Sequence, residues 1–181
     1  TAEESAGQVR SRAERTGALQ ETLYLAAESN LDAVFGHVDK LKPSLIIVDS
    51  VQTMHAVGVE GVSGGVAQSR AVTAALTTLA KTTNLPVLLV GHVTKDGNVA
   101  GPRVLEHMVD AVLYFEGESG SRFRVMRAFK NRFGAVNELG VFGMTDKGLK
   151  EVTNPSAIFL TRAQEAVPGS VVMATWEGTR P

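Results

Sequence analysis

Two short, unbroken apolar runs stand out in the pattern of hydrophobic and polar positions. They cover residues 45–48 (LIIV) and 86–90 (PVLLV), and such runs are typical of strands buried on both faces. Apolar residues recur at helical spacing in residues 4–17, in residues 29–43 and from residue 66 to about residue 81. Because predicted strands and helices alternate, the pattern predicts an α/β protein with a largely parallel sheet.

Local signals mark where several of these elements begin and end. Gly17 is a predicted stop for the first helix, and Ser29 or Asn30 can cap the second. Residues 23–28 (LYLAAE) form an apolar run of strand length, and residues 58–65 (GVEGVSGG) predict a glycine-rich loop before the third helix.

The pattern changes in the second half of the chain, where strands follow one another more closely. The predicted elements are a loop at 93–102, strands at 110–117 and 121–131, a hairpin with its turn near 146–148, a turn, short helix and loop over 153–169, and an isolated strand at 170–178.

Composition limits the class of protein. The chain has 181 residues, 44% of them hydrophobic, which is enough for one ordinary domain with a core. No apolar run is long enough to span a bilayer, and the absence of cysteine excludes disulfides and thiolate metal sites. The net charge of −1 means that any DNA binding must come from local patches. We therefore expect a soluble, cytoplasmic protein without membrane contact.

Polar residues at the predicted strand ends are candidates for chemistry. Asp49 follows the first apolar run, a pattern that holds Mg²⁺ in nucleotide hydrolases, although an aspartate there can also cap the next segment. His92 follows the second run and can contact a phosphate or position water, but a lone histidine is more often structural. Glu3 and Glu4 precede the first helix, where one can orient an attacking water, or where both simply suit a helix N-terminus.

Two cations close the predicted strand at 121–131. Lys130 and Arg132 are one residue apart and are predicted to lie on the same face of that strand, so together they suit an anion. The alternative is that they pair with local acids such as Glu138.

Four segments carry a resemblance to a known family. They are residues 1–5 (TAEES), 45–54 (LIIVDSVQTM), 87–118 and 130–134 (KNRFG). Together they resemble the bacterial RadA/Sms family of DNA-repair ATPases, which are RecA-like, and the resemblance extends over the whole chain.

The resemblance implies a fold and a domain organisation. It implies a RecA-like, mainly parallel sheet flanked by helices, incomplete at its N-terminal side and with a short C-terminal extension. Residues 1–150 would be the ATPase core, and residues 151–181 a linker and the first strand of a Lon-protease-like domain. ATP and Mg²⁺ are the implied cofactors, and zinc would be confined to an N-terminal module of the family that this sequence does not contain.

The resemblance also implies a role for each candidate residue. Asp49 would hold Mg²⁺, Glu3 would orient water, and His92 would sense the γ-phosphate. Lys130 and Arg132 would act on the nucleotide of a neighbouring subunit. The anion that these cations suit would then belong to a second copy of the chain.

Two glycine-rich loops are the implied DNA-binding elements, at residues 57–68 and 94–103, with Lys95 and Arg103 as the cations of the second. The implied function is a DNA-dependent ATPase, a motor on single-stranded DNA that processes or extends recombination intermediates by branch migration. The implied assembly is a hexameric ring, and a RecA-type recombinase is the implied partner.

One expected motif is missing from the sequence. No phosphate-binding G-x-x-x-x-G-K-[ST] loop occurs, so we expect it to lie upstream and expect this chain alone to be inactive. Two alternatives stay open, a replicative-type ring helicase and a catalytically inactive binding or assembly module.

Overall fold

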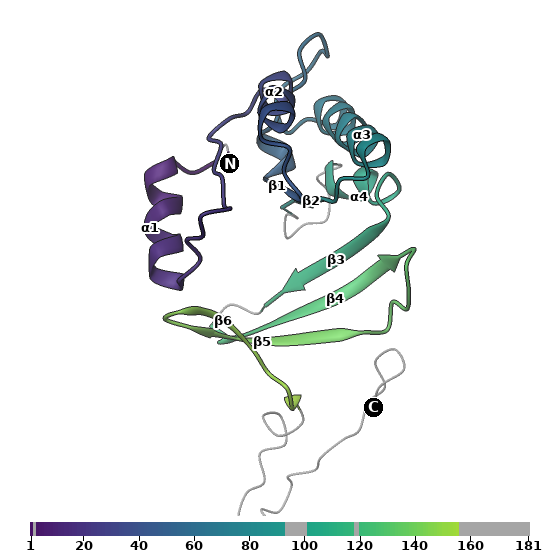
Figure 1. Ribbon diagram of the computed structural model, residues 1–181. Coiled ribbons are helices and arrows are strands. Elements are labelled where there is room, and N and C mark those ends of the chain that lie inside the picture. The colour runs from purple at the N-terminus through teal and green to yellow at the C-terminus, as the bar shows by residue number, and fades with distance from the viewer. Residues whose placement is uncertain (2, 93–100, 118–119, 156–181) are drawn as a thin grey trace, which may run out of the picture. The chain divides into compact units, whose positions relative to one another are not determined.

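The computed structural model describes residues 1, 3–92, 101–117 and 120–155, with only the backbone for 101–103 (Figure 1). The chain divides into two compact units, Thr1–Val109 and Asp110–Pro181.

The first unit combines helices with a parallel pair of strands. Strands β1 and β2 pair in parallel, with Asp49 opposite Val90. The elements of this unit are α1 (Ala6–Thr16), α2 (Leu31–Leu41), β1 (Ile46–Asp49), the 3-10 helix η1 (Val51–Thr53), α3 (Val66–Thr83), β2 (Val87–Val90) and α4 (Gly101–Glu106).

The core of the first unit lies between β1, β2 and the helices α2 and α3 (Figure 1). Val72 and Leu76 of α3 are completely buried, and β1 contributes Ile46 and Val48 to the same core. Ile47 lies between them in the strand and is 55% exposed. The prediction that this strand is buried on both faces is therefore wrong, because side chains alternate along it and the described residues cover one face only.

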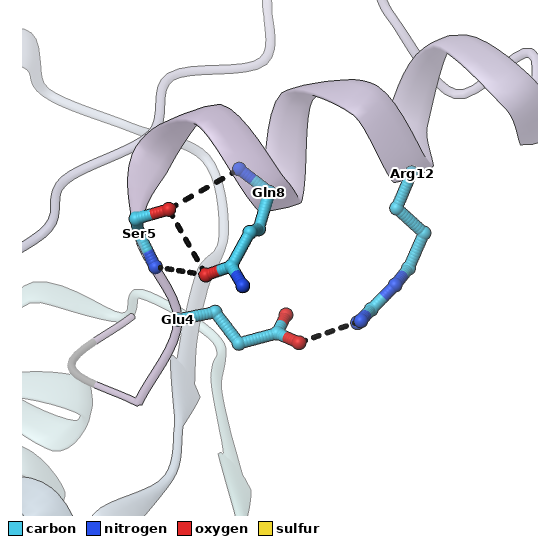
Figure 2. Close-up of polar contacts among 4 residues, drawn as sticks. All are labelled: Glu4, Ser5, Gln8 and Arg12. Atoms are coloured by element: carbon cyan, nitrogen blue, oxygen red, sulfur yellow. Dashed lines mark hydrogen bonds and ion pairs between the residues drawn. The ribbon is translucent and has the colours of Figure 1, made fainter.

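Local signals define α1 as predicted. The backbone N–H of Ser5 donates to Oε1 of Gln8 at 3.0 Å, and Oγ of Ser5 accepts from the backbone N–H of Gln8 at 3.4 Å, which forms a capping box (Figure 2). At the other end Gly17 has φ +68°, a left-handed conformation that glycine adopts without steric cost. Asn30 caps α2, since its Oδ1 accepts from the backbone N–H of Asp32 at 2.8 Å.

The strand predicted at residues 23–28 is not formed. Its backbone makes two hydrogen bonds to Thr1, from the Thr1 nitrogen to the Ala26 oxygen at 2.7 Å and from the Glu28 nitrogen to the Thr1 oxygen at 3.1 Å. Leu23 and Tyr24 are 55% and 66% exposed. An apolar run becomes a strand only where another segment pairs with it. Among the described residues only Thr1 makes such hydrogen bonds to this run.

The loop predicted at residues 93–102 ends earlier than expected, because α4 begins at Gly101. Pro102 lies in the first turn of this helix, where its missing N–H and fixed φ are tolerated.

The second unit is an antiparallel sheet with the strand order β3-β4-β5-β6. Its hairpin β5–β6 turns at the predicted residues, with Gly148 at φ +107°. The strands are β3 (Ala111–Glu116), β4 (Phe123–Asn131), β5 (Leu139–Thr145) and β6 (Gly148–Glu151).

The α/β class is confirmed, but the described strands are less parallel than predicted, because only β1 and β2 pair in parallel and the strands of the second unit pair antiparallel. The elements expected over 156–181 lie outside the described residues, so the division into 1–150 and 151–181 stays a prediction. No helix among the described residues is both long and apolar enough to cross a membrane.

Candidate nucleotide site

The parallel strands bring three candidate residues together. Asp49 ends β1, and His92 follows the end of the neighbouring strand β2, so their predicted adjacency is present. Glu3 reaches the same place from the N-terminus. Ligand atoms of Glu3, Asp49 and His92 all lie within 4.8 Å of one another.

Glu3 is held by contacts to both strand ends. Its Oε1 accepts a hydrogen bond from Oγ of Ser50 at 2.5 Å and lies 3.2 Å from Nε2 of His92. Ser50 is completely buried, so its hydroxyl is a fixed donor, whereas the Glu3 side chain remains 39% exposed. A carboxylate that is fixed at one oxygen and open to water can orient a water molecule.

The structure also distinguishes Glu3 from Glu4. Oε1 of Glu4 lies 2.6 Å from Nη2 of Arg12, so Glu4 forms an ion pair with α1 (Figure 2). The sequence left open which of the two acids has the chemical role, and the structure places Glu3 beside Asp49.

The donor set suits magnesium. Mg²⁺ in nucleotide enzymes is held by one or two carboxylates and the substrate phosphates, and Asp49 and Glu3 offer two carboxylates at one sheet edge. Asp49 would hold the ion, which would neutralise phosphate charge. The sequence contains no phosphate-binding lysine loop, so a nucleotide at this cluster would need its phosphates held by other residues.

Sequence reasoning missed two residues that support this site, Ser50 and Gln52. Nε2 of Gln52 donates to the backbone oxygen of His92 at 3.1 Å, which ties η1 to the end of β2. Oε1 of Gln52 is buried without a hydrogen-bond partner among the described residues. The available signal was position, since Ser50 directly follows a strand that ends in a candidate ligand and Gln52 lies two residues further on.

The two predicted cations lie in the second unit. Lys130 is in β4 opposite Val112. The shared face of the two cations stays a prediction, and β4 ends one residue before Arg132. The strand ends at Asn131, whose Oδ1 accepts from the backbone N–H of Phe133 at 3.0 Å and starts a turn.

Arg132 has a partner that the sequence did not suggest. Its Nη1 lies 2.8 Å from Oδ1 of Asp110, and its backbone N–H donates to the backbone oxygen of Asp110 at 3.0 Å. Arg132 therefore pairs with a nearby acid, as the structural alternative expected, and this acid is Asp110.

The predicted DNA-binding loops are only partly described. Lys95 lies outside the described residues, and Arg103 is placed in α4 by its backbone alone. In the first loop Gly61 has φ +113°. The expected end of this loop, Gln68, lies in α3 and is only 4% exposed. Its amide accepts from the Ala56 nitrogen at 2.8 Å and donates to the Val59 oxygen at 2.6 Å, so Gln68 shapes the loop from inside.

The fold places the chain in a class. A solved structure titled a KaiC-like protein, from Pyrococcus horikoshii, matches with a TM-score of 0.56 at 16% identity, over 84% of this chain and 73% of that one. The fold is RecA-like α/β, as the sequence predicted. No protein-family model matches the chain.

Curated relatives show which proteins the chain is similar to in sequence. The DNA repair protein RadA of Pseudomonas aeruginosa is 59% identical over all of this chain. RadA of Mycolicibacterium smegmatis is 54% identical, and RadA of Streptococcus pneumoniae 52%, each over 99% of this chain. The chain spans 39–43% of the length of these three relatives. The predicted resemblance to RadA is therefore confirmed over the whole chain, which corresponds to about two fifths of such a protein.

Proposed function

We propose that this chain is part of a DNA-repair ATPase and that its strand-end cluster is the hydrolytic part of the nucleotide site. The observation that carries the proposal is the meeting of Glu3, Asp49 and His92 within 4.8 Å. Asp49 holds Mg²⁺, Glu3 orients the attacking water and takes its proton, and His92 contacts the γ-phosphate. The buried hydroxyl of Ser50 keeps Glu3 in place.

Lys130 and Arg132 act on a nucleotide bound by the neighbouring subunit in this proposal. Such cations stabilise the charge on the transferred phosphoryl group. The planar guanidinium of Arg132 can meet two phosphate oxygens at once, which lysine cannot. The exposure of the Arg132 side chain, 55%, leaves it accessible to a second copy of the chain.

We further propose the wider role of the complete protein. It is a cytoplasmic DNA-dependent ATPase that works on single-stranded DNA and recombination intermediates, as a homo-oligomer with a hexameric ring as the expected form. Branch migration is the expected process, and a RecA-type recombinase the expected partner. The names of the relatives, all DNA repair proteins, support the repair role.

Two other functions compete with this proposal. A replicative-type ring helicase shares the fold class, but whole-chain identity to RadA proteins favours the repair ATPase. An inactive binding or assembly module is favoured by the missing phosphate-binding loop. The cluster of two carboxylates and an imidazole supports the repair ATPase over this alternative.

The experiment compares Glu3→Gln with Glu4→Gln in the complete protein. Glu4 is a matched control for Glu3, because it is the next residue and of the same type, but it pairs with Arg12 while Glu3 lies beside Asp49. A general base contributes about 10²–10⁴ in rate, so we expect Glu3→Gln to lower kcat at least 100-fold and Glu4→Gln to leave it within a few-fold. Equal activity of the two variants would contradict the proposal.

A further inference from the structure

The contact between Arg132 and Asp110 joins the start of one strand to the end of its neighbour. Asp110 directly precedes β3, and Arg132 follows β4, with Ala111 and Asn131 paired between them. The backbone hydrogen bond from Arg132 to Asp110, at 3.0 Å, fixes the register at this point. The side-chain contact of 2.8 Å between Nη1 and Oδ1 then sets the direction of the guanidinium.

The pair leaves part of the guanidinium available. Arginine has five N–H donors in a planar fork, and in the described residues the contact with Asp110 engages only the Nη1 end. The Arg132 side chain is 55% exposed and that of Asp110 37% exposed. An exposed ion pair of this kind contributes little to folding stability. Its main effect is to restrict the orientation of the Arg132 guanidinium.

We propose that Asp110 is the positioning residue for Arg132. It holds one end of the guanidinium so that the other end faces the phosphate of the neighbouring subunit. An arginine side chain loses rotational freedom when it binds, and a partner that already restricts it reduces this cost. The inference rests on the proposed trans role of Arg132 and adds to it the residue that orients this side chain.

The sheet offers a matched control. Glu116 in β3 lies 3.8 Å from Arg127 in β4, so Oε2 of Glu116 and Nε of Arg127 form a second acid–arginine contact between the same two strands. Glu116→Gln removes a comparable charge without touching Arg132. A general effect of charge on this sheet would appear in both variants.

The first measurement is steady-state ATP hydrolysis by the complete protein. We expect Asp110→Ala to lower kcat about 10-fold with a smaller change in KM, because misplacing a catalytic group costs rate more than binding. Asp110→Asn keeps the shape and an acceptor oxygen, so its loss should be smaller, and Glu116→Gln should match the parent protein. Circular dichroism on each variant checks that the fold is retained, and Asp110→Asn covers the case in which Asp110→Ala does not fold.

The second measurement mixes subunits. If Asp110 positions Arg132, Asp110→Ala subunits should regain activity when mixed with Asp49→Ala subunits, because each then supplies the half that the other lacks. Mixing Asp110→Ala with Arg132→Ala should recover nothing, since both defects lie in the same half. A purely structural role for Asp110 would not produce this selective pattern.

Two results separate failure of the inference from failure of the proposed function. If Arg132→Ala is slow but Asp110→Ala hydrolyses ATP like the parent protein, the positioning role is wrong and the trans role stands. If Arg132→Ala itself has normal turnover, the trans role is wrong and the inference falls with it. Recovery in the mixture of Asp110→Ala and Arg132→Ala would also overturn the inference.

Discussion

Replacement of Ser50 by alanine tests whether the fixed position of Glu3 matters for turnover. The Ser50 hydroxyl is completely buried and donates to Oε1 of Glu3 at 2.5 Å. A hydrogen bond to a charged group contributes about 1.5–3 kcal/mol. We take the lower end, because the Glu3 side chain is 39% exposed and water can replace part of the lost contact. About 1.5 kcal/mol corresponds to roughly a 10-fold decrease in rate.

The assay is steady-state ATP hydrolysis by the complete protein carrying Ser50→Ala, with Ser69→Ala as the matched control. Ser69 is 1% exposed, and its Oγ has no hydrogen-bond partner among the described residues, so its removal costs no described contact. We expect kcat to fall about 10-fold for Ser50→Ala and to stay unchanged for Ser69→Ala. An unchanged kcat in Ser50→Ala, or an equal loss in both variants, would refute the role of this hydrogen bond.

Three further predictions concern stability and DNA binding. Leu76→Ala should lower the unfolding free energy by about 2–5 kcal/mol in chemical denaturation, because it opens a cavity at a fully buried site, while Leu41→Ala, which removes a side chain 47% exposed, should cost much less. The backbone N–H groups of Asn30 and Ser29 lower the pKa of Glu28 in the folded protein. The ionised Glu28 therefore adds to folding stability above its unfolded pKa, and this stability is lost as the pH falls through its folded pKa. Glu28→Gln should flatten the acid side of a plot of thermal midpoint against pH, and an unchanged plot would contradict this. Lys95→Ala with Arg103→Ala should reduce the log–log salt slope of single-stranded DNA binding by about 0.7 for each lost phosphate contact, and an unchanged slope would place the DNA site elsewhere.

The sequence predicted best the features that depend on near neighbours in the chain. The helix α1 was predictable because Ser5, Gln8 and Gly17 supply its caps locally. The meeting of Asp49 and His92 was predictable from a simple rule, because the carboxyl ends of adjacent parallel strands lie at one edge of a sheet.

The features that sequence reasoning missed depend on contacts between distant residues. Residues 23–28 have the composition of a strand, yet strand formation requires a paired neighbour that composition does not specify. The choice between Glu3 and Glu4 depends on the direction in which the chain enters α1. The pairing of Arg132 with Asp110 joins residues 22 positions apart, and only the register of β3 and β4 brings them together.

The most direct test of the account mixes two inactive variants of the complete protein. Asp49→Ala removes the magnesium ligand of a subunit's own site, and Arg132→Ala removes the cation proposed to act on its neighbour's nucleotide. If the two halves of one site come from adjacent subunits, mixed oligomers should regain ATP hydrolysis that neither variant has alone, at the interfaces where an intact Asp49 meets an intact Arg132. Formation of mixed oligomers without recovery of hydrolysis at any ratio would contradict the account.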